Sequence, residues 1–548
     1  MARLHEIHDE RFMSALFRNL ARQKKVSVTV HLNGKKTPTE LFFGGTQGRE
    51  PRVRLSPETS ASVNGDPVKI AFLNKAMFFL FETRLRHVGD DTYSVDKPQV
   101  IYSSFRRMLP RYRFDTGKGG TVTFYDHPCE CPLVDISTEG FSFLCDEKLW
   151  NGREIVRNIT LHLDSGAEIR IDGRVRYYRK EKDGRYLYGL RISEQHWFPR
   201  YELFKYIARK TYSNIRWIEE FTDQEVHALY DKSGYLSLKS REEMEHSFTN
   251  MLEAYDKIRD KKQISASPVY FSDDKMLTVC SVLRIYDRTF LGHQLASLPE
   301  ARMNLKSKTD VYLVLADFLI DHLYCENYLS YFDISLPWHQ EIFRRIGSYI
   351  DDKNKFVFDE LEFFECHTVQ TETVNEGSEF AVDVLEGSEQ FRRFCHWNLD
   401  PIEVGCYAYD EKHFNLREIS QVYEVLDLYV SRRLWAITKK SKVVAYAVAE
   451  AYSDGLNCFN LLDMCRVYFS AETVAKRDIL KALLPNVGLF FRKFKKDRFY
   501  VVFKCRTDVK TLEFRGLEHR HSAGRVMMSR PGIVEYRTVL SMNSRQGG

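Results

Sequence analysis

The sequence predicts a multidomain protein in which two β domains precede an α/β region. Short runs rich in β-branched and aromatic residues, separated by Gly-containing turns, fill roughly the first 200 positions. From about Tyr201 onward, stretches with helical periodicity alternate with strand-like runs. The length of 548 residues leaves room for three or four domains, each with its own core.

The composition excludes several classes of protein. Hydrophobic residues make up 43% and charged residues 29%, which is typical of a globular chain. Lys and Arg total 81 against 76 Asp and Glu, so the net charge is only +5, which argues against general nucleic-acid binding. No apolar run resembles a signal peptide or is long enough to span a bilayer. We therefore expect a cytoplasmic protein without membrane insertion.

The eleven Cys residues are scattered without the regular spacing of a disulfide framework. In a reducing cytosol they are expected to be free thiols. Cys129 and Cys131, near His127, form the one tempting metal motif, but the second ligand pair of a zinc site is missing. The sequence therefore predicts no metal site.

The N-terminal segment, residues 1–22, is predicted to be a helix. Over residues 4–22 five apolar side chains recur roughly on one helical face: Ile7, Phe12, Leu16, Phe17 and Leu20. A β domain is predicted to follow over residues 23–104, because its strand-like runs are punctuated by turn signals such as Asn33-Gly34 and Asn64-Gly65.

Two short motifs follow this β domain. The first is Arg107-Met-Leu-Pro-Arg111, inside the basic run Phe105 to Arg113, and the second is Asp135-Ile-Ser137-Thr-Glu-Gly140. Pro110 keeps the residue before it extended, which suits a linker that enters a strand. Short strands are predicted between and after the motifs, ending with Tyr186 to Ile192.

An Arg-x-x-x-Arg followed by Asp/Asn-x-Ser-x-x-Gly resembles the signature of the PilZ family of bacterial receptors for cyclic di-GMP. The resemblance implies a PilZ β-barrel over residues 105–200, with residues 105–113 as its linker motif. It also implies cyclic di-GMP as the ligand. The ligand-binding residues implied by it are Arg106, Arg107, Arg111, Asp135, Ser137 and Gly140.

These residue types suit that ligand. An Arg fork can bind a phosphate or the O6/N7 edge of guanine, and its plane can stack on a base. The Asp135 carboxylate can accept from the N1 and N2 donors of guanine, and the Ser137 hydroxyl can add one bond. In the family, an Arg at the position of Arg106 tends to accompany a bound nucleotide dimer. The β domain before the linker resembles the split barrel of flagellar-brake (YcgR-type) PilZ proteins.

The C-terminal part is predicted to hold a connecting helix over residues 201–221 and two α/β lobes over 222–380 and 385–545. Residues 331–347 and the hairpin 434–450 resemble segments of GNAT-type acyltransferases. The order of strands and helices recurs in the two lobes, which suggests a tandem and degenerate pair. The stretch 524–540, with Pro531-Gly532 as its turn, is predicted to close the second lobe as a hairpin.

No catalytic residue is predicted in these lobes. Where GNAT enzymes carry a Gly-containing motif for the acyl-CoA pyrophosphate, this chain has Arg466-Val-Tyr-Phe469-Ser-Ala471, and Phe469 would obstruct the phosphates. Acyl-CoA is therefore not expected to bind. Glu365, His367, Tyr446 and Glu450 are possible acids or bases, but no pattern pairs them.

The sequence thus favours a cyclic di-GMP receptor whose PilZ module regulates a C-terminal GNAT-like module that binds an unknown protein partner. Two alternatives remain open at this stage. One is an acyl- or aminoacyl-transferase regulated by cyclic di-GMP. The other is a structural adaptor that has kept the PilZ shell and lost the ligand.

Overall fold

The protein is described by a computed structural model and divides into two compact units, Met1–Thr211 and Tyr212–Gly547. The residues that the structure describes are 5–7, 17, 20, 25–32, 35–44, 50–55, 67–74, 77–105, 111–115, 119–193, 197–235, 241–259, 261–301, 305–334, 337–350, 352–371, 379–386, 389–456, 462–470, 475–504 and 511–543.

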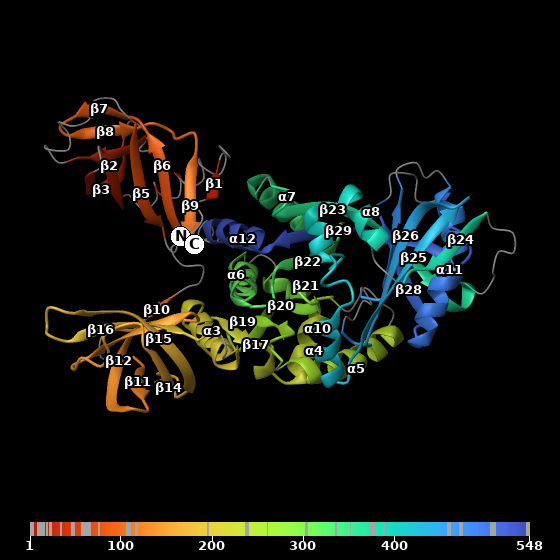
Figure 1. Cartoon of the computed structure of the whole chain (residues 1–548), viewed down its shortest axis with the longest axis horizontal. Helices are drawn as coiled ribbons and strands as arrows, with labels where there is room; N and C mark the ends of the chain where they lie inside the picture. Colours follow the sequence, from red (N-terminus) through yellow and green to blue (C-terminus); the bar gives the residue numbers. More distant parts are fainter. Residues whose placement is uncertain are drawn as a thin grey trace. The chain divides into compact units, whose positions relative to one another are not determined.

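The first part of the N-terminal unit is one antiparallel sheet of nine strands (Figure 1). Its strands are β1 (His5–Ile7), β2 (Lys25–Leu32), β3 (Lys35–Gly44), β4 (Glu50–Arg54), β5 (Val68–Asn74), β6 (Met77–Thr83), β7 (Leu85–Gly89), β8 (Thr92–Val95) and β9 (Ile101–Phe105). They lie in the order β1-β9-β6-β5-β2-β3-β4-β8-β7. Alternate residues such as Val30, Ile70 and Phe81 are fully buried, as expected for strands with one face in a core.

The start of the predicted N-terminal helix is a strand instead. His5–Ile7 pair antiparallel with Ile101, Tyr102 and Ser103 of β9, at the edge of the sheet. The helical prediction was wrong here because backbone pairing to an exposed edge outweighs the periodicity of a few apolar side chains. Of the rest of that segment, the structure describes only Phe17 and Leu20, both helical.

The second part of this unit is a closed barrel followed by a helix. Its elements are β10 (Tyr112–Arg113), β11 (Thr121–Phe124), β12 (His127–Ser137), β13 (Gly140–Cys145), β14 (Ile155–His162), β15 (Glu168–Lys180), β16 (Tyr186–Ile192) and α3 (Trp197–Thr211). The strand order is β10-β12-β11-β14-β15-β16-β13, and an additional pairing of β12 with β13 closes the ring. The longest of these strands is β15, with 13 residues.

The C-terminal unit contains one sheet of thirteen strands. Its strands are β17 (Ile215–Trp217), β18 (Ser265–Ala266), β19 (Pro268–Ser272), β20 (Lys275–Tyr286), β21 (Thr289–Ser297), β22 (Asn327–Asp333), β23 (Phe356–His367), β24 (Phe380–Val384), β25 (Val430–Lys439), β26 (Lys442–Tyr452), β27 (Met464–Phe469), β28 (Arg498–Phe503) and β29 (Leu517–Ser529). The helices are α4 (Asp223–Lys232), α5 (Arg241–Ile258), α6 (Leu305–Asp321), α7 (Pro337–Ile350), α8 (Glu389–Asn398), α9 (Pro401–Cys406), α10 (Arg417–Val425), α11 (Lys476–Lys493) and α12 (Arg530–Asn543).

The two predicted lobes are joined by an exchange of strands at the centre of this sheet. The order runs β21-β22-β29-β23-β28-β27, so the last strand of the chain lies between two strands of the first lobe. Strand β23 of the first lobe in turn pairs with β28 of the second. In each half a helix, α6 or α11, connects a parallel pair of strands, β21–β22 or β27–β28. The recurring order seen in the sequence is therefore present in the topology, within a single sheet.

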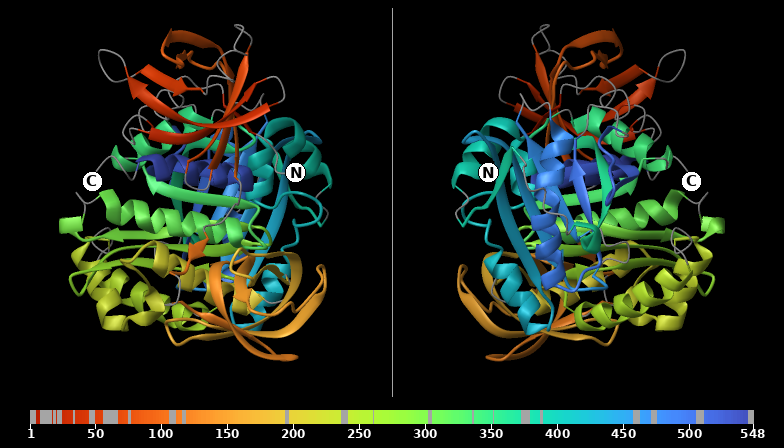
Figure 2. Two further views of the ribbon diagram at one scale, coloured as in Figure 1. Left: turned by 90° about the vertical axis from the view of Figure 1, so that its left-hand side faces the viewer. Right: turned by 90° about the vertical axis from the view of Figure 1, so that its right-hand side faces the viewer.

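The predicted hairpin at 524–540 is wrong. Strand β29 ends at Ser529, and helix α12 begins at Arg530. Pro531 falls in the first turn of the helix, where its missing N–H breaks no helical hydrogen bond, so it starts a helix rather than a turn. Helix α12 lies beside α6 and α7, from the first half of the unit (Figures 1 and 2).

The predicted connecting helix also differs from the structure. Helix α3 ends at Thr211, and Ile215–Trp217 form β17, which pairs with β19 at one edge of the large sheet. Within the described part of the chain, no helix combines the length and apolarity that crossing a membrane would require.

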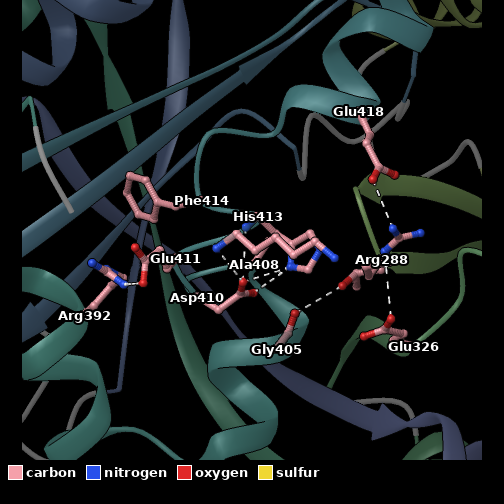
Figure 3. Close-up of polar contacts among 12 residues, drawn as sticks. Arg288, Glu326, Arg392, Gly405, Ala408, Asp410, Glu411, His413, Phe414 and Glu418 are labelled. Carbon is pink, nitrogen blue, oxygen red and sulfur yellow. Dashed lines mark hydrogen bonds and ion pairs between the residues drawn. The ribbon is translucent and has the colours of Figure 1, made fainter. Parts of the chain in front are cut away.

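The segment from α9 to α10 also ties the two halves together (Figure 3). Arg288, in the turn between β20 and β21, lies 3.0 Å from the Glu418 carboxylate of α10. The Thr289 hydroxyl donates to the Gly405 carbonyl at 3.4 Å, and the Asp287 carboxylate accepts from the Ile419 amide at 2.8 Å. These bonds fix a segment of the second half against a turn of the first.

Candidate functional site

The two sequence motifs meet on the wall of the closed barrel. The short strand β10 pairs Tyr112 with Ile136 and Arg113 with Asp135. This antiparallel register brings Arg111, just before β10, alongside the second motif on β12. On the other side of β12, Asp135 faces Ser142 of β13.

Asp135 anchors the site by two short contacts. Arg111 Nη1 lies 2.6 Å from Asp135 Oδ1, and the Ser142 hydroxyl donates to the same oxygen at 2.5 Å. Asp135 is 8% exposed, so this charge is held by partners rather than by water. Among the described residues, no group accepts a hydrogen bond from the buried Nε of Arg111. The guanidinium is therefore oriented by Asp135 and keeps a donor for a further acceptor.

A hollow of about 190 Å³ opens beside these residues. It is lined by Arg111, Ser137, Glu139, Gly140, Phe141, Arg176, Tyr177, Gly189, Leu190 and Arg191. Three of the six residues predicted to bind the ligand, namely Arg111, Ser137 and Gly140, line it directly. Asp135 stands behind Arg111. Arg106 and Arg107 lie outside the described residues.

Two β-bulges shape the hollow. Between Val175 and Tyr177 the pairing of β15 with β16 shifts, which leaves Arg176 as the extra residue. A second shift, between Leu133 and Asp135, leaves Val134 as the extra residue of β12. A bulge bends its strand and redirects side chains, and bulges occur often beside binding sites. The first bulge places Arg176 and Tyr177 next to each other at the hollow.

Two glycines are needed where the strands approach closely. A Cβ added at Gly140 would lie 2.2 Å from the backbone oxygen of Leu190 on β16. One added at Gly189 would lie 2.3 Å from the ring of Tyr177, which is 45% exposed. The first contact is with backbone and cannot yield easily, whereas the second is with a ring that can turn toward solvent. Ser137 also donates to the Gly140 carbonyl at 2.9 Å, which holds the turn between β12 and β13.

The sequence motifs did not reveal Arg176, Tyr177 and Arg191. These residues come from the closing strands, and only the bulge and the pairing of Gly140 with Arg191 bring them to the motif. The hollow thus combines three guanidiniums, an aromatic face and a hydroxyl with one carboxylate, that of Glu139. Such a set can bind an anion that carries a flat base, because Arg binds phosphates and base edges and aromatic rings stack on bases.

Three thiols also meet in the barrel wall. The structure adds Cys145 of β13 to the pair Cys129 and Cys131 that the sequence had singled out. They are the described residues best suited to hold a metal, and none of them lines the hollow.

Of the four possible acids and bases in the C-terminal unit, the two carboxylates, Glu365 and Glu450, are held by arginines. Glu450 is fully buried, with Arg432 Nε and Arg466 Nη1 each 2.8 Å from its oxygens and a Tyr286 hydroxyl at 2.6 Å. Burial acts to raise the pKa of Glu450, but Arg466 and Arg432 lower it overall. Glu365 is paired with Arg498 and Arg520. Both carboxylates are thus engaged in ion pairs inside the sheet.

The degenerate acyl-CoA motif lies at the end of β27, where β27 and β28 run parallel. Arg466, its first residue, points into the ion cluster of Glu450. Phe469 contacts Phe503, the last residue of β28, with ring centroids 5.5 Å apart and nearly perpendicular rings. Aromatic packing therefore joins the ends of the two strands.

Comparison with known families agrees with the motifs. Residues 105–198 match the family model described as PilZ domain, so the chain contains a PilZ domain. This confirms the resemblance drawn from the two motifs. No curated protein matches the chain.

Solved structures similar to this chain fall into two groups. The complex of K. pneumonia MrkH with c-di-GMP is 16% identical with a TM-score of 0.29, over 38% of this chain and 98% of that one. Escherichia coli YcgR in complex with c-di-GMP is 12% identical with a TM-score of 0.29, over 38% and 93%. A GCN5-related N-acetyltransferase from Anabaena variabilis is 9% identical with a TM-score of 0.26, over 58% and 73%.

The glycine contacts predict unequal effects of two substitutions. Gly140→Ala should lower the free energy of unfolding of the barrel by about 1–3 kcal/mol, since the new methyl group meets backbone. Gly189→Ala should cost less, because the Tyr177 ring can move. Native-state hydrogen exchange of β13 and β16 measures both values. Equal losses in the two variants would contradict this account.

The ion cluster predicts a pH-dependent stability. Since the pKa of Glu450 lies below 4.5 in the folded protein, its stabilisation is complete above that pH and is lost as the pH falls further. Glu450→Gln should therefore destabilise the C-terminal unit at neutral pH, by up to about 3–5 kcal/mol for a broken buried pair. The difference from the wild type should shrink under acid. Urea unfolding at several pH values tests this, with the exposed Glu424→Gln as the matched control. A difference that stayed constant with pH would show that the carboxylate charge is not what stabilises the unit.

Proposed function

We propose that the PilZ domain binds cyclic di-GMP in the hollow beside Arg111. The observation that carries the proposal is the gathering of Arg111, Arg176 and Arg191 around the family motif, in a domain whose family resemblance implies this ligand. Two phosphates and two guanines require both positive charge and flat or hydrogen-bonding surfaces, and the hollow supplies both.

We assign the roles as follows. Arg111 binds a phosphate or a guanine edge through the donors that Asp135 leaves available. Asp135 orients Arg111 and can exchange that partner for the N1 and N2 donors of a guanine. Arg176 and Arg191 supply further charge from the closing strands, and Tyr177 offers its exposed ring for stacking. Arg106 and Arg107 contribute from the linker.

We further propose that the nucleotide regulates the C-terminal unit, which acts as an interaction module for a protein partner and not as an acyltransferase. Arg466 is engaged by Glu450, and Phe469 packs on Phe503 where an acyl donor would need open backbone. Both contacts favour a GNAT-like shell that no longer binds acyl-CoA. A receptor for an intracellular second messenger works in the bacterial cytoplasm, and we place the protein there.

Removing Arg111 should weaken binding. Arg111→Ala is expected to reduce affinity for cyclic di-GMP at least about tenfold, by the scale of charge-assisted hydrogen bonds. Arg176→Ala should weaken it in the same direction, while the matched control Arg179→Ala should not, because Arg179 is paired with Glu181 outside the hollow. Isothermal titration of the folded variants measures each affinity. Unchanged binding by Arg111→Ala would refute the site.

The stoichiometry should be two nucleotides per chain. Arg106 precedes the first motif, and an additional cation there would help to hold four phosphates and four stacked bases. Arg106→Leu should shift the titration toward one nucleotide per chain. Saturation of the wild type at one nucleotide would contradict this prediction.

Nucleotide binding should also change the arrangement of the domains. The linker 105–113 is the most cationic segment between two domains, so an anion that binds there adds contacts to both. The effect can be no larger than the preference of the nucleotide for the rearranged form. With ligand, we expect slower hydrogen exchange at 105–113 and a changed small-angle scattering profile, and an acyl-CoA titration run beside it should give no heat. Overlapping profiles at saturation would mean that the ligand only stabilises the domain.

A further inference from the structure

A cluster of three thiols lies in the wall of the PilZ barrel. The Sγ atoms of Cys129, Cys131 and Cys145 all lie within 4.8 Å of one another, and those of Cys129 and Cys131 are 3.8 Å apart. Cys129 and Cys131 belong to β12, and Cys145 ends the neighbouring strand β13. The cluster therefore depends on the pairing of β12 with β13 and could not be seen in the Cys-x-Cys spacing alone.

The pairing of β11 with β12 is irregular next to these thiols. Thr123 of β11 pairs with Glu130, but the next residue, Phe124, pairs with His127. Pro128 and Cys129 are thus additional residues of β12 at this point. Residues two apart share one face of a strand, and here the Cys129 sulfur lies 3.8 Å from that of Cys131.

The sulfur separations fit a shared cation. Metal–thiolate bonds are about 2.3 Å long for zinc, so three sulfurs arranged in a plane around one ion lie about 4 Å apart. The 3.8 Å between the Cys129 and Cys131 sulfurs is close to this value. The sulfur–sulfur distances to Cys145 are within 4.8 Å, so small side-chain adjustments can shorten them to the same length. Thiolate ligands select soft cations such as Cu(I) and zinc.

The number of ligands favours Cu(I). Zinc in structural sites is almost always four-coordinate, whereas Cu(I) is stable with three sulfurs. Within the described part of the chain, no His, Asp or Glu side chain joins the three sulfurs as a fourth ligand. His127 is close in sequence, but its ring packs edge-to-face on Trp150, with centroids 5.5 Å apart.

Two of the three thiols are buried and the third is partly exposed. Cys131 and Cys145 are 2% and 6% exposed and belong to the same apolar core as Phe124 and Phe143. Cys129 is only half-buried and gives the cluster access to solvent. A cation binds to the thiolates, so the thiol protons leave to solvent when it binds.

We propose that Cys129, Cys131 and Cys145 form a binding site for one Cu(I) ion in the PilZ barrel, separate from the nucleotide hollow. None of the three residues lines that hollow, so the site stands or falls independently of cyclic di-GMP. Both sites lie on β12 but use different residues. Each can therefore be altered without changing a side chain of the other.

The test is a competition for Cu(I) under strictly anaerobic conditions. The full-length reduced protein is titrated into the coloured Cu(I)–bicinchoninate complex, and the loss of colour gives stoichiometry and affinity. We expect one Cu(I) per chain at this site, with three sulfur neighbours in the copper X-ray absorption spectrum. Cys131→Ser and Cys145→Ser should each lower the affinity by more than about 100-fold, since even an outer-sphere partner typically contributes 10–100-fold.

Two further variants make the result decisive. Cys129→Ser alters a half-buried position and should keep the fold while losing the same affinity. Cys395→Ser, a buried thiol of α8 outside the cluster, is the matched control and should leave copper uptake unchanged. Circular dichroism checks that each variant is folded. Uptake that is absent in the wild type, unchanged in Cys129→Ser, or displaced in favour of zinc with a fourth ligand would overturn the proposal.

Discussion

The pairing of strand β12 with its three neighbours is the constraint on which both candidate sites of the N-terminal unit depend. The strand pairs with β10, β11 and β13, and the pairing with β13 closes the barrel. Its far end holds Asp135 and Ser137 at the hollow, and its near end holds Cys129 and Cys131 at the thiol cluster. A change of register by one residue would turn all these side chains to the opposite face, so the register of this strand decides both sites at once.

Bulges then distort the regular barrel beside the hollow. A regular strand alternates its side chains between the core and solvent, which leaves few directions for a binding residue. The additional residues Val134 and Arg176 break that alternation at two places along the wall. Arg176 reaches the hollow for this reason. The apolar core beneath, with Ile136, Phe141 and Val175 fully buried, keeps the distorted strands in place.

In the C-terminal unit the corresponding constraint is the exchange of β23 and β29. Because each half of the unit supplies a strand to the other, neither half can complete its sheet alone. Buried charges reinforce the junction: Arg525 of β29 lies 2.7 Å from Glu403 of α9 and pairs with Asp359 of β23. Such pairs are costly to bury and costly to break, which favours one arrangement of the two halves over others. The two halves therefore form one sheet and not two independent lobes.

Much of this protein was determined by local sequence. The PilZ motifs, the two β domains and the alternation of the C-terminal part were all predicted, because turn residues, periodicity and motif spacing act over short distances. Local signals failed where distant partners decide the outcome. His5–Ile7 became a strand because β9 offers a free edge, and Pro531 began a helix because α12 packs on α6 and α7.

The residues of the candidate sites divide in the same way, into those that local sequence predicts and those that distant partners bring together. Sequence alone predicted Arg111, Asp135, Ser137 and Gly140, since these residues belong to motifs that are contiguous in the chain, and the structure places Arg111, Ser137 and Gly140 at the hollow. It did not identify Arg176, Arg191 or Cys145, which reach their sites only through strand pairing, and it did not reveal the strand exchange. Pairing partners and bulges are chosen by the packing of the whole sheet, and the energies of that packing are not written in any single segment. The sequence therefore determined which functional groups are present, and the tertiary structure decided which of them lie together in one site.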